Sequence, residues 1–282
     1  MKNLSDINTI KRILSRHGFT FSKSLGQNFI IDSSVCPEIS ESANLDENTA
    51  VIEIGAGIGV LTVELAKRAG KVLSFELDKR LLPILKETLS EFSNIEVINE
   101  DILKADLASI IAKKCAGMRV VVAANLPYYI TSPVIMMLLE SKFNIESITV
   151  MVQKEAAIRL CAPVGTREGG AVTVAVNYYA AAERLFEVPR TSFLPQPKVD
   201  SEVIKLKCRK SANISIKDEK VFFKIVKGAF IQRRKTLKNS LFATLLIPKE
   251  KTAEVLLSLG INENIRAEKL TMEDFANLSN RL

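Results

Sequence analysis

Histidine and cysteine are scarce in this chain. Its 282 residues include one histidine, His17, and four cysteines that lie far apart and form no Cys-x-x-Cys pair. A zinc site built from cysteine and histidine is therefore not expected, and neither is a disulfide framework in a chain of this size. A single histidine also argues against a hydrolase with a Ser–His or Cys–His pair. We expect no metal site and no chemistry that depends on a histidine base.

Long hydrophobic runs are missing as well. No uninterrupted apolar stretch approaches the about 20 residues that span a bilayer, and the polar N-terminal segment has no apolar signal core. Hydrophobic residues make up 47% of the chain and charged residues 25%, which is a globular balance and excludes a disordered chain. We therefore expect a cytoplasmic protein with no membrane partner, long enough for an α/β core and a smaller second domain.

The net charge of +7 is distributed unevenly. Residues 1–28 carry +4 and residues 29–204 carry −6, whereas residues 205–240 hold 12 basic and two acidic side chains and carry +10. Lysine-rich helices are often only solvated surfaces. A basic segment that follows an acidic body is more specific, and it suggests a polyanion such as nucleic acid as the partner.

Short apolar runs rich in β-branched residues alternate with helical patterns from residue 50 onward, which predicts βα units and a mostly parallel sheet. The expected strands are residues 50–54, 71–75, 95–99, 119–124 and 147–153, with helices at 60–68 and 79–92. Residues 171–182 and 202–207 are expected to form a late strand pair, and the segments 218–246, 249–259 and 272–282 to be helical. The predicted fold class is α/β, and parallel strands followed by a late strand pair resemble the layout of the Rossmann-like methyltransferases. The domain with this layout is expected over residues 1–210 with its N-terminal arm, and a small α-helical domain over residues 211–282.

A glycine-rich turn follows the first strand, in the sequence Glu53-Ile-Gly55-Ala-Gly57-Ile-Gly59. Glycines at these positions let the backbone turn tightly and approach a ligand at the start of the next helix. The dinucleotide fingerprint G-x-G-x-x-G is the competing interpretation, but Val60 stands where its third glycine should be. The spacing argues mildly against NAD.

Two acidic residues follow the next two strands. Glu76 lies 21 residues after Gly55 and can accept hydrogen bonds from a ribose diol. Asp101 follows the third strand and can accept from the exocyclic amine of an adenine. Either acid alone is more often a plain surface charge. Together with the glycines they stand at three successive strand ends, where such sheets bind ligands, and so predict a cofactor that contains a nucleoside.

The fourth strand runs directly into Asn125-Leu126-Pro127-Tyr128. The ordinary interpretation is a strand-ending turn. However, the exocyclic amine of a nucleobase is a poor nucleophile because its lone pair is delocalised into the ring. The Asn125 side-chain oxygen and the Leu126 carbonyl can accept its N–H groups and favour the pyramidal form, while Pro127 stiffens the turn and the Tyr128 ring stacks on the base. The motif therefore predicts methylation of a base amine without a general base.

This motif and the segments around it resemble the ribosomal RNA adenine N6-dimethyltransferases. The segments in the order of that family are SLGQNFI at 24–30, VIEIGAGIGVLT at 51–62, FELD at 75–78, NEDIL at 99–103, AANLPYYITSPVI at 123–135, FLPQPKVDS at 193–201 and AFIQRRK at 229–235. The last two particularly resemble the small-subunit (16S) branch, the KsgA/RsmA type. Tyr129 stands where many relatives have asparagine, and we expect little effect because it follows the catalytic turn.

The resemblance implies an S-adenosylmethionine-dependent enzyme that methylates each of two adjacent adenines twice on N6, in the 3′-terminal hairpin of 16S rRNA. The substrate partner is the small ribosomal subunit, and the resemblance implies a role in the biogenesis of that subunit. We expect the enzyme to be a monomer. The implied catalytic residues are Asn125, Leu126, Pro127, Tyr128 and Phe193, with Phe193 sandwiching the target adenine against Tyr128. The implied cofactor contacts are Gln27, Asn28, Ile30, Glu53, Gly55, Gly57, Glu76, Asp101 and Asn125.

Contacts to one base cannot position a ribosomal subunit, so we expect two basic patches to bind RNA phosphates, largely by shape. The first patch comprises Lys11, Arg12, Arg16 and Lys23 in the N-terminal arm. The second comprises Arg233, Arg234, Lys235 and Lys238, which lie within two turns of an expected helix.

Three alternatives stay open. A large-subunit (23S) adenine N6-methyltransferase of the macrolide-resistance type shares the GQNF segment, the glycine loop and the Asn-[Leu/Ile]-Pro-Tyr motif, but the segments 193–201 and 229–235 favour the small-subunit branch. A non-catalytic RNA-binding assembly factor, or a transcription factor of this fold, could have lost Asn125, Glu76 or the glycines, and this chain retains them. A DNA adenine methyltransferase would more usually carry Asp-Pro-Pro-Tyr.

Overall fold

The computed structural model describes residues 3–22, 25–141, 143–212 and 214–282. The chain divides into two compact units, and each is described by itself. The first unit comprises Met1–Ala157 and Glu183–Cys208, and the second comprises Ile158–Ala182 and Arg209–Leu282. The sequence places a single boundary at residue 210, whereas this division crosses the chain three times and assigns the segment Ile158–Ala182 to the C-terminal unit.

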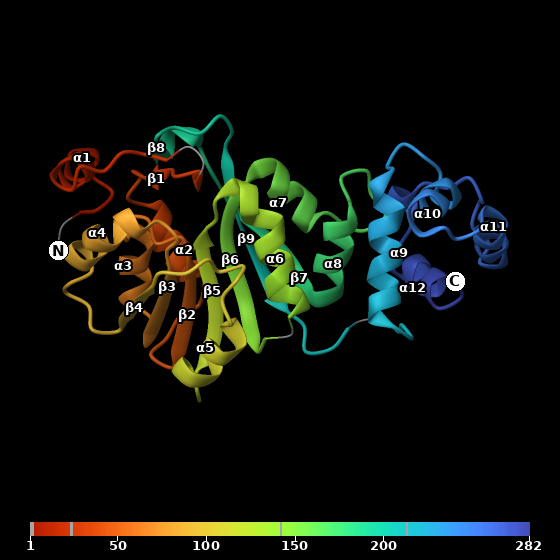
Figure 1. Cartoon of the computed structure of the whole chain (residues 1–282), viewed down its shortest axis with the longest axis horizontal. Helices are drawn as coiled ribbons and strands as arrows, with labels where there is room; N and C mark the ends of the chain where they lie inside the picture. Colours follow the sequence, from red (N-terminus) through yellow and green to blue (C-terminus); the bar gives the residue numbers. More distant parts are fainter. Residues whose placement is uncertain (1–2, 23–24, 142, 213) are drawn as a thin grey trace. The chain divides into compact units, whose positions relative to one another are not determined.

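The first unit contains a seven-stranded sheet of order β4-β3-β2-β5-β6-β9-β7 (Figure 1). Its strands are β2 (Thr49–Ile54), β3 (Lys71–Phe75), β4 (Ile95–Ile98), β5 (Arg119–Asn125), β6 (Ile145–Gln153), β7 (Ala180–Val188) and β9 (Ser201–Cys208). The strands from β4 to β6 pair in parallel, and β9 pairs with β6 in the antiparallel sense. The five expected parallel strands are therefore confirmed, each within two residues of its expected bounds, and the Rossmann-like fold class with them.

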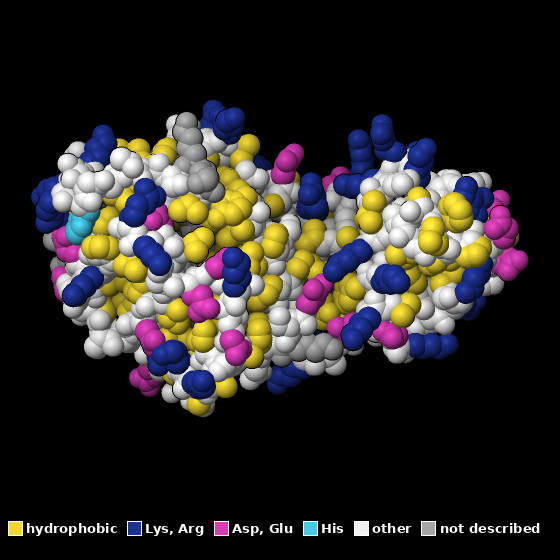
Figure 2. Space-filling view, in the orientation of Figure 1, with side chains coloured by type: hydrophobic (Ala, Val, Ile, Leu, Met, Phe, Trp, Pro, Cys, Tyr) yellow, Lys and Arg dark blue, Asp and Glu magenta, His cyan; other side chains and the backbone are white. Residues whose placement is uncertain are grey.

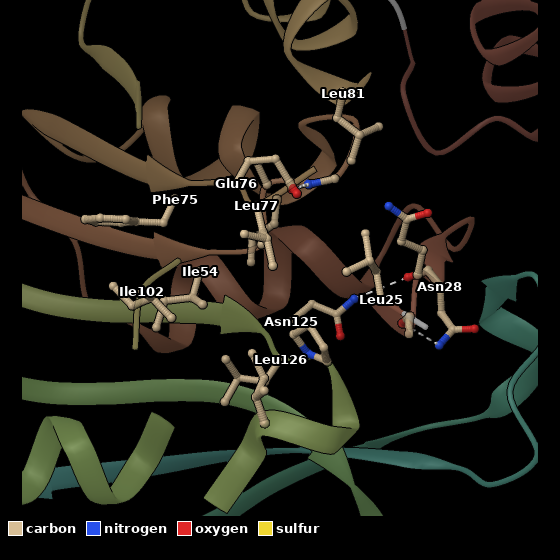
Figure 3. A pocket seen from close by; sticks show the side chains of 18 of the residues that line it. Leu25, Asn28, Ile54, Phe75, Glu76, Leu77, Leu81, Ile102, Asn125 and Leu126 are labelled. Atoms are coloured by element: carbon tan, nitrogen blue, oxygen red, sulfur yellow. Dashed lines mark hydrogen bonds between the residues drawn. The ribbon is translucent and has the colours of Figure 1, made fainter. Parts of the chain in front are cut away.

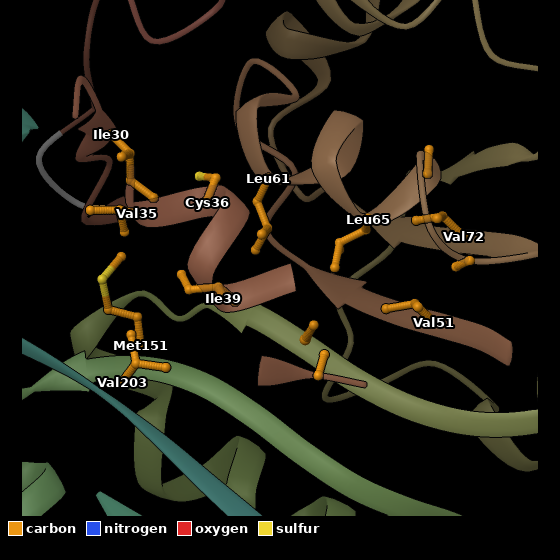
Figure 4. Packing of buried hydrophobic residues seen from close by; sticks show 14 of the residues in the cluster. Ile30, Val35, Cys36, Ile39, Val51, Leu61, Leu65, Val72, Met151 and Val203 are labelled. Atoms are coloured by element: carbon orange, nitrogen blue, oxygen red, sulfur yellow. The ribbon is translucent and has the colours of Figure 1, made fainter. Parts of the chain in front are cut away.

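Apolar residues fill both faces of the central strands, as a parallel sheet requires. All six residues of β2 are buried. On one face, α2 (Val35–Ser42) and α3 (Val60–Ala66) pack on the sheet, and Figure 4 shows Ile39 and Leu65 in the same cluster as Val51 and Val203. The remaining helices that begin in this unit are α1 (Ile7–Arg16), α4 (Leu82–Thr88), α5 (Leu107–Lys114), α6 (Thr131–Glu140) and α7 (Lys154–Cys161).

A two-stranded sheet joins the N-terminal arm to a loop far along the chain. Strand β1 (Phe29–Ile30) pairs antiparallel with β8 (Phe193–Leu194). Next to this pair, the Ile31 N–H donates to the Ser192 carbonyl at 2.9 Å, and the Ser192 hydroxyl donates to Asp32 Oδ2 at 3.1 Å. The SLGQNFI and FLPQPKVDS segments of the sequence are thereby brought together.

The second unit is helical and contains α8 (Ala171–Tyr179), α9 (Glu219–Ile231), α10 (Leu237–Leu245), α11 (Lys249–Ser258) and α12 (Met272–Ser279). Helix α9 packs against α8, α10 and α12. Four aromatic side chains hold α8 to α9, since the rings of Tyr178, Tyr179, Phe222 and Phe223 lie 4.8 to 5.6 Å apart, centroid to centroid. Short 3-10 turns occur in the chain at Lys79–Leu81, Tyr128–Ile130, Arg190–Ser192 and Ala267–Lys269.

The expectation of a strand at residues 171–182 is wrong, because Ala171–Tyr179 is helix α8 and the strand β7 begins only at Ala180. The segment is rich in β-branched residues, which favours a strand on propensity alone. Two tertiary features outweigh that propensity. The Thr173 hydroxyl accepts from the Gly170 N–H at 2.9 Å and caps the helix start, and the aromatic packing against α9 buries Tyr178.

The single helix expected over residues 218–246 is two helices, α9 and α10. Gln232, with φ −114° and ψ 64°, leaves the helical conformation, and the Lys235 N–H donates to its carbonyl at 2.8 Å to close a turn. Gly228 lets α10 fold back closely on α9, because a Cβ there would lie 2.9 Å from the Thr244 hydroxyl oxygen. Residues 79–92 are also less helical than expected, since α4 ends at Thr88.

The described part of the chain contains no helix that is both long and apolar enough to cross a membrane. It also contains no group of three or more His, Cys, Asp or Glu side chains placed to hold a metal ion.

Candidate active site

A cavity of about 390 Å³ opens where the parallel strands end. The residues after β2, β3, β4 and β5 contribute to its walls, which is the edge at which open α/β sheets bind ligands. The expected site residues that line it are Gln27, Asn28, Ile30, Gly55, Gly57, Glu76, Asp101, Asn125, Leu126, Pro127 and Tyr128. The fold thus brings all but one of the expected cofactor residues and the expected catalytic turn to one cavity.

The glycine loop forms the floor of this cavity between β2 and α3. Gly55 and Gly57 have φ values of +82° and +59°, a region that side chains with a Cβ rarely adopt. A Cβ on Gly57 would also lie 3.4 Å from the Phe29 ring of β1. Glycine is therefore favoured here by the turn, and the Phe29 ring of the N-terminal arm packs directly beside it.

Glu76 is held firmly at the end of β3. Its Oε2 accepts the Gly57 N–H at 2.9 Å and its Oε1 accepts the Asp78 N–H at 2.8 Å. The residue is only 7% exposed, and burial raises the pKa of its carboxyl group. The carboxyl group lines the cavity (Figure 3), so its remaining lone pairs can accept hydrogen bonds from a diol.

Two leucines that the sequence analysis missed complete this side of the cavity. Leu77 is 48% exposed and Leu103 is 38% exposed, which is unusual for leucines that line a cavity. They directly follow Glu76 and the Asp101-Ile102 pair, so apolar residues next to acids at strand ends were the available signal. Apolar side chains suit the flat face of a base and the two carboxylates suit its sugar and amine. These apolar side chains and hydrogen-bond acceptors therefore fit a nucleoside, including that of S-adenosylmethionine.

The turn of residues 125–128, expected to be catalytic, lies across the cavity from Glu76 (Figure 3). Asn125 ends β5, and its Nδ2 faces the Asn28 carbonyl of the N-terminal arm at 3.5 Å (Figure 3). The Leu126 side chain is buried and its N–H donates to the Met151 carbonyl of β6 at 3.1 Å. With Nδ2 turned to Asn28, the Asn125 side-chain oxygen is directed away from that carbonyl, and the turn itself is fixed from both flanks.

Tyr128 is oriented by a serine that the sequence analysis did not single out. Its hydroxyl lies 2.7 Å from the hydroxyl oxygen of Ser201, which is fully buried at the start of β9. Burial raises the pKa of the Tyr128 phenol. Ser201 is the last residue of the FLPQPKVDS segment. The sequence motif therefore includes this serine, although the motif alone gives it no role. The next residue, Tyr129, also lines the cavity, closer to the site than expected.

Two expected site residues do not line the cavity. Glu53 is 1% exposed in the middle of the sheet, where its Oε2 accepts from the Thr62 and Ser74 hydroxyls at 2.7 and 2.6 Å. Phe193 is 3% exposed and packs in the same core cluster as Ile30. Their expected roles stay predictions, because neither side chain lines the cavity that the other expected residues share.

The chain was compared with known proteins. The family model described as ribosomal RNA adenine dimethylase matches residues 18–282. The chain belongs to that family. This dimethylase membership confirms the resemblance that the motifs carry.

The proteins similar to this chain include a methyltransferase named for small-subunit rRNA and one named for 23S rRNA. The chain is 49% identical to "Ribosomal RNA small subunit methyltransferase A" of Geobacillus thermodenitrificans, over 100% of this chain and 97% of the relative. The structure of the 23S rRNA methyltransferase ErmE is similar with a TM-score of 0.68 and 30% identity, over 90% of this chain and 99% of that one. A dimethyladenosine transferase from Plasmodium falciparum has a TM-score of 0.73 and 27% identity, over 89% and 95% of the two chains.

The N-terminal basic patch expected for this dimethylase lies on α1. Lys11 and Arg12 are exposed, while Ile10 and Ile13 of the same helix are buried. Arg16 is paired with Glu87 at 2.8 Å. Lys23 lies outside the described residues.

The second basic patch lies on the turn between α9 and α10, where Lys and Arg side chains gather in Figure 2. Arg233, Arg234 and Lys235 are exposed in this turn rather than on a helix as expected. Arg233 also donates to the carbonyls of Arg167 and Gly169 at 3.0 and 2.9 Å. Lys238 is on α10 and is paired with Glu263 at 2.6 Å, so it is the least available of the four.

Proposed function

We propose that this chain transfers methyl groups from S-adenosylmethionine to N6 of two adjacent adenines in the 3′-terminal hairpin of 16S rRNA, giving N6,N6-dimethyladenosines. The observation that carries the proposal is that Asn125, at the end of β5, lines the same cavity as Glu76 and Asp101. Acceptors for an adenosine-containing donor and acceptors for a base amine thus face one space of about 390 Å³.

Glu76 and Asp101 are the residues proposed to hold the donor, Glu76 through a ribose diol and Asp101 through an adenine amine. Leu77 and Leu103 cover the faces of the adenine ring. When bound, S-adenosylmethionine supplies an electrophilic methyl group on a sulfonium. Glu76 stays in place for this role because two backbone N–H groups already fix its carboxylate.

Asn125 and Leu126 are proposed to activate the target amine. The Asn125 side-chain oxygen and the Leu126 carbonyl accept hydrogen bonds from N6, which favours the pyramidal amine and frees its lone pair. The lone pair forms the new N–C bond as the methyl–sulfur bond breaks, and the proton on the positively charged N6 leaves to solvent. The same acceptors serve the second methylation, in which N6 carries one hydrogen. No side chain with a tuned pKa is needed.

Tyr128 is proposed to stack on the target adenine. Extruding a base costs a few kcal/mol of unstacking, and stacking on an aromatic ring returns about 1–3 kcal/mol per base. The bond to Ser201 keeps the ring in one orientation. We propose Tyr128 rather than Phe193 for this role, because Tyr128 lines the cavity and Phe193 is buried.

The small ribosomal subunit is the proposed partner, held through phosphates by Lys11, Arg12, Arg234 and Lys235 in the cytoplasm, with the enzyme acting as a monomer. The 49% identity to a small-subunit methyltransferase over the whole chain supports this choice over the large subunit.

Incubation with labelled S-adenosylmethionine and either small or large subunits from unmethylated cells tests the proposal. Nuclease digestion and mass spectrometry should find N6,N6-dimethyladenosine in 16S rRNA at two adjacent positions. Label found only in large-subunit RNA would instead support the 23S activity that the similar ErmE structure carries. Subunit binding without any methyl transfer would support a non-catalytic assembly factor.

A further inference from the structure

Asp78 is a buried carboxylate close to the cavity that has no part in the proposed mechanism. Its side chain is 5% exposed, and each of its two oxygens accepts two hydrogen bonds. Oδ1 accepts from the Arg80 backbone N–H at 3.0 Å and from Arg80 Nε at 2.9 Å. Oδ2 accepts from Arg80 Nη2 at 2.6 Å and from Gln27 Nε2 at 2.8 Å. Asp78 therefore joins the turn after β3 to the N-terminal arm.

Arg80 extends the same connection further along the arm. Its Nη1 donates to the Thr20 carbonyl at 3.3 Å, and its guanidinium lies 5.0 Å from the centroid of the Phe19 ring. Phe19 packs in turn against the ring of Phe29, with centroids 6.1 Å apart. Gln27 closes the connection, because its Oε1 accepts the Ser22 N–H at 2.9 Å.

The arm that these contacts hold is a wall of the cavity. Leu25, Gly26, Gln27 and Asn28 all line it, and the Asn28 carbonyl meets the catalytic Asn125. A Cβ added to Gly26 would lie 3.5 Å from the Tyr129 ring, so the arm also borders the turn that follows Asn125. The Asp78 backbone N–H is also one of the two groups that fix Glu76. One short turn thus supports two sides of the donor site.

We propose that Asp78 and Arg80 are positioning residues that hold the described part of the arm, residues 19–22 and 25–28, in place as a wall of the methyl-donor site. The proposal rests on the function proposed above, because it assigns these residues to the donor rather than to RNA. A wall that is ordered before the ligand arrives needs no ordering during binding, so affinity is higher. Charge-assisted, bidentate bonds such as those between Asp78 and Arg80 give this geometric control.

Helix capping is the simpler role that a test must separate. The Asp78 carboxylate accepts the Arg80 backbone N–H at the start of the turn that leads into α4, and any residue at position 80 except proline keeps that bond. Arg80→Met therefore removes the side-chain bonds to Asp78 and Thr20 and leaves the cap intact. Lys79→Met is the matched control, because Lys79 is the exposed neighbouring cation.

The experiment measures the dissociation constant of S-adenosylmethionine by calorimetry without RNA, and amide hydrogen exchange in residues 19–28. For Arg80→Met we expect a dissociation constant about tenfold higher, as loss of charge-assisted hydrogen bonds implies. Exchange in the arm should be faster, while kcat at saturating donor and the KM for subunits stay within about twofold of the wild-type values. Arg80→Lys keeps the positive charge but cannot form the bidentate bonds of a guanidinium. Its dissociation constant should lie between those of the wild type and Arg80→Met. Lys79→Met should match the wild type.

Donor affinity within twofold of the wild-type value in folded Arg80→Met would overturn the proposal. A raised KM for subunits at unchanged donor affinity would also overturn it, because Arg80 would then be an RNA contact. If Arg80→Met does not fold, the donor affinity and arm exchange of Arg80→Lys decide in the same way. Failure of the wild-type chain to bind S-adenosylmethionine would instead contradict the proposed function, so the two failures are distinguishable.

Discussion

Charged side chains near the cavity and charged side chains on the α9–α10 turn are in opposite surroundings. Glu53, Glu76 and Asp78 are at most 7% exposed, and each accepts hydrogen bonds from the protein. Arg234 and Lys235 are exposed, and neither has an ion-pair partner in the part of the chain that the structure describes. Buried groups respond to pH and to the loss of single atoms, whereas exposed cations respond to salt. The difference predicts separate experimental signatures for the two regions.

Asn125→Ala should cause the largest loss of methyl transfer, and this effect should be confined to the cavity region. Removing one preorganised polar contact to a reacting group commonly costs about 10²–10³ in turnover, and we expect a loss of at least that size. Subunit binding should persist, because the basic patches are unchanged. Single-turnover methyl transfer and filter binding measure the two quantities. Asn48→Ala, which removes an exposed amide from the same unit, is the control. Turnover near that of the wild type would contradict the amine-acceptor role.

Glu53→Gln should change the pH dependence of stability. Burial raises the pKa of the folded Glu53 from 4.5 to about 7. Because the folded pKa is the higher one, the protonated carboxyl favours the fold, and this contribution is complete below pH 4.5 and lost as pH rises through 7. The free energy of unfolding of the wild type should fall by on the order of 3 kcal/mol over that range relative to the glutamine variant.

Urea unfolding of both proteins at several pH values from 4 to 8 measures this difference. Glutamine resembles the protonated carboxyl group, so the variant isolates Glu53 from Glu76, which titrates in both proteins. Parallel stability curves would show that Glu53 stays ionised in its buried position.

Neutralising Arg233, Arg234 and Lys235 together should weaken subunit binding by about tenfold or more. The slope of log K against log salt concentration should become shallower by about 2 to 3, because each phosphate contact contributes about 1. Donor affinity should not change. Neutralising Arg68, Lys79 and Lys113, three exposed cations of the first unit, is the control for net charge. Equal losses in both triple variants would mean that total charge, and not this turn, binds RNA.

The sequence predicted the cavity better than it predicted the packing around it. The glycine turn, Glu76, Asp101 and Asn125 follow strands whose periodicity is strong, so the ends of those strands were predictable and the residues came together as expected. Residues 171–179 were misjudged because their propensity favours a strand, whereas the cap at Gly170 and the aromatic contacts with α9 favour the helix. The break at Gln232 depends on α10 packing on Gly228, which no local pattern shows.

Side-chain direction was the other limit. Phe193 belongs to the same motif as Ser201, yet Phe193 faces the core and Ser201 contacts the hydroxyl of Tyr128. The pairing of β1 with β8 decides this, and it joins residues more than 160 positions apart. The role of Asp78 was hidden for the same reason, because its partner Gln27 lies 51 residues earlier in the chain.

Tyr128→Phe and Ser201→Ala should have the smallest effects and should not be additive. Each removes the bond between the two hydroxyls while the ring that stacks on the base remains. A single hydrogen bond contributes about 1 kcal/mol, so we expect kcat to fall about three- to fivefold in either variant. If the bond acts only by orienting the ring, the double variant should be no slower than the slower single variant. If the losses in kcat of the two single variants multiply in the double variant, the Tyr128 hydroxyl has a separate role at the target amine. Activity in the cavity region would then depend on one more polar group than we propose.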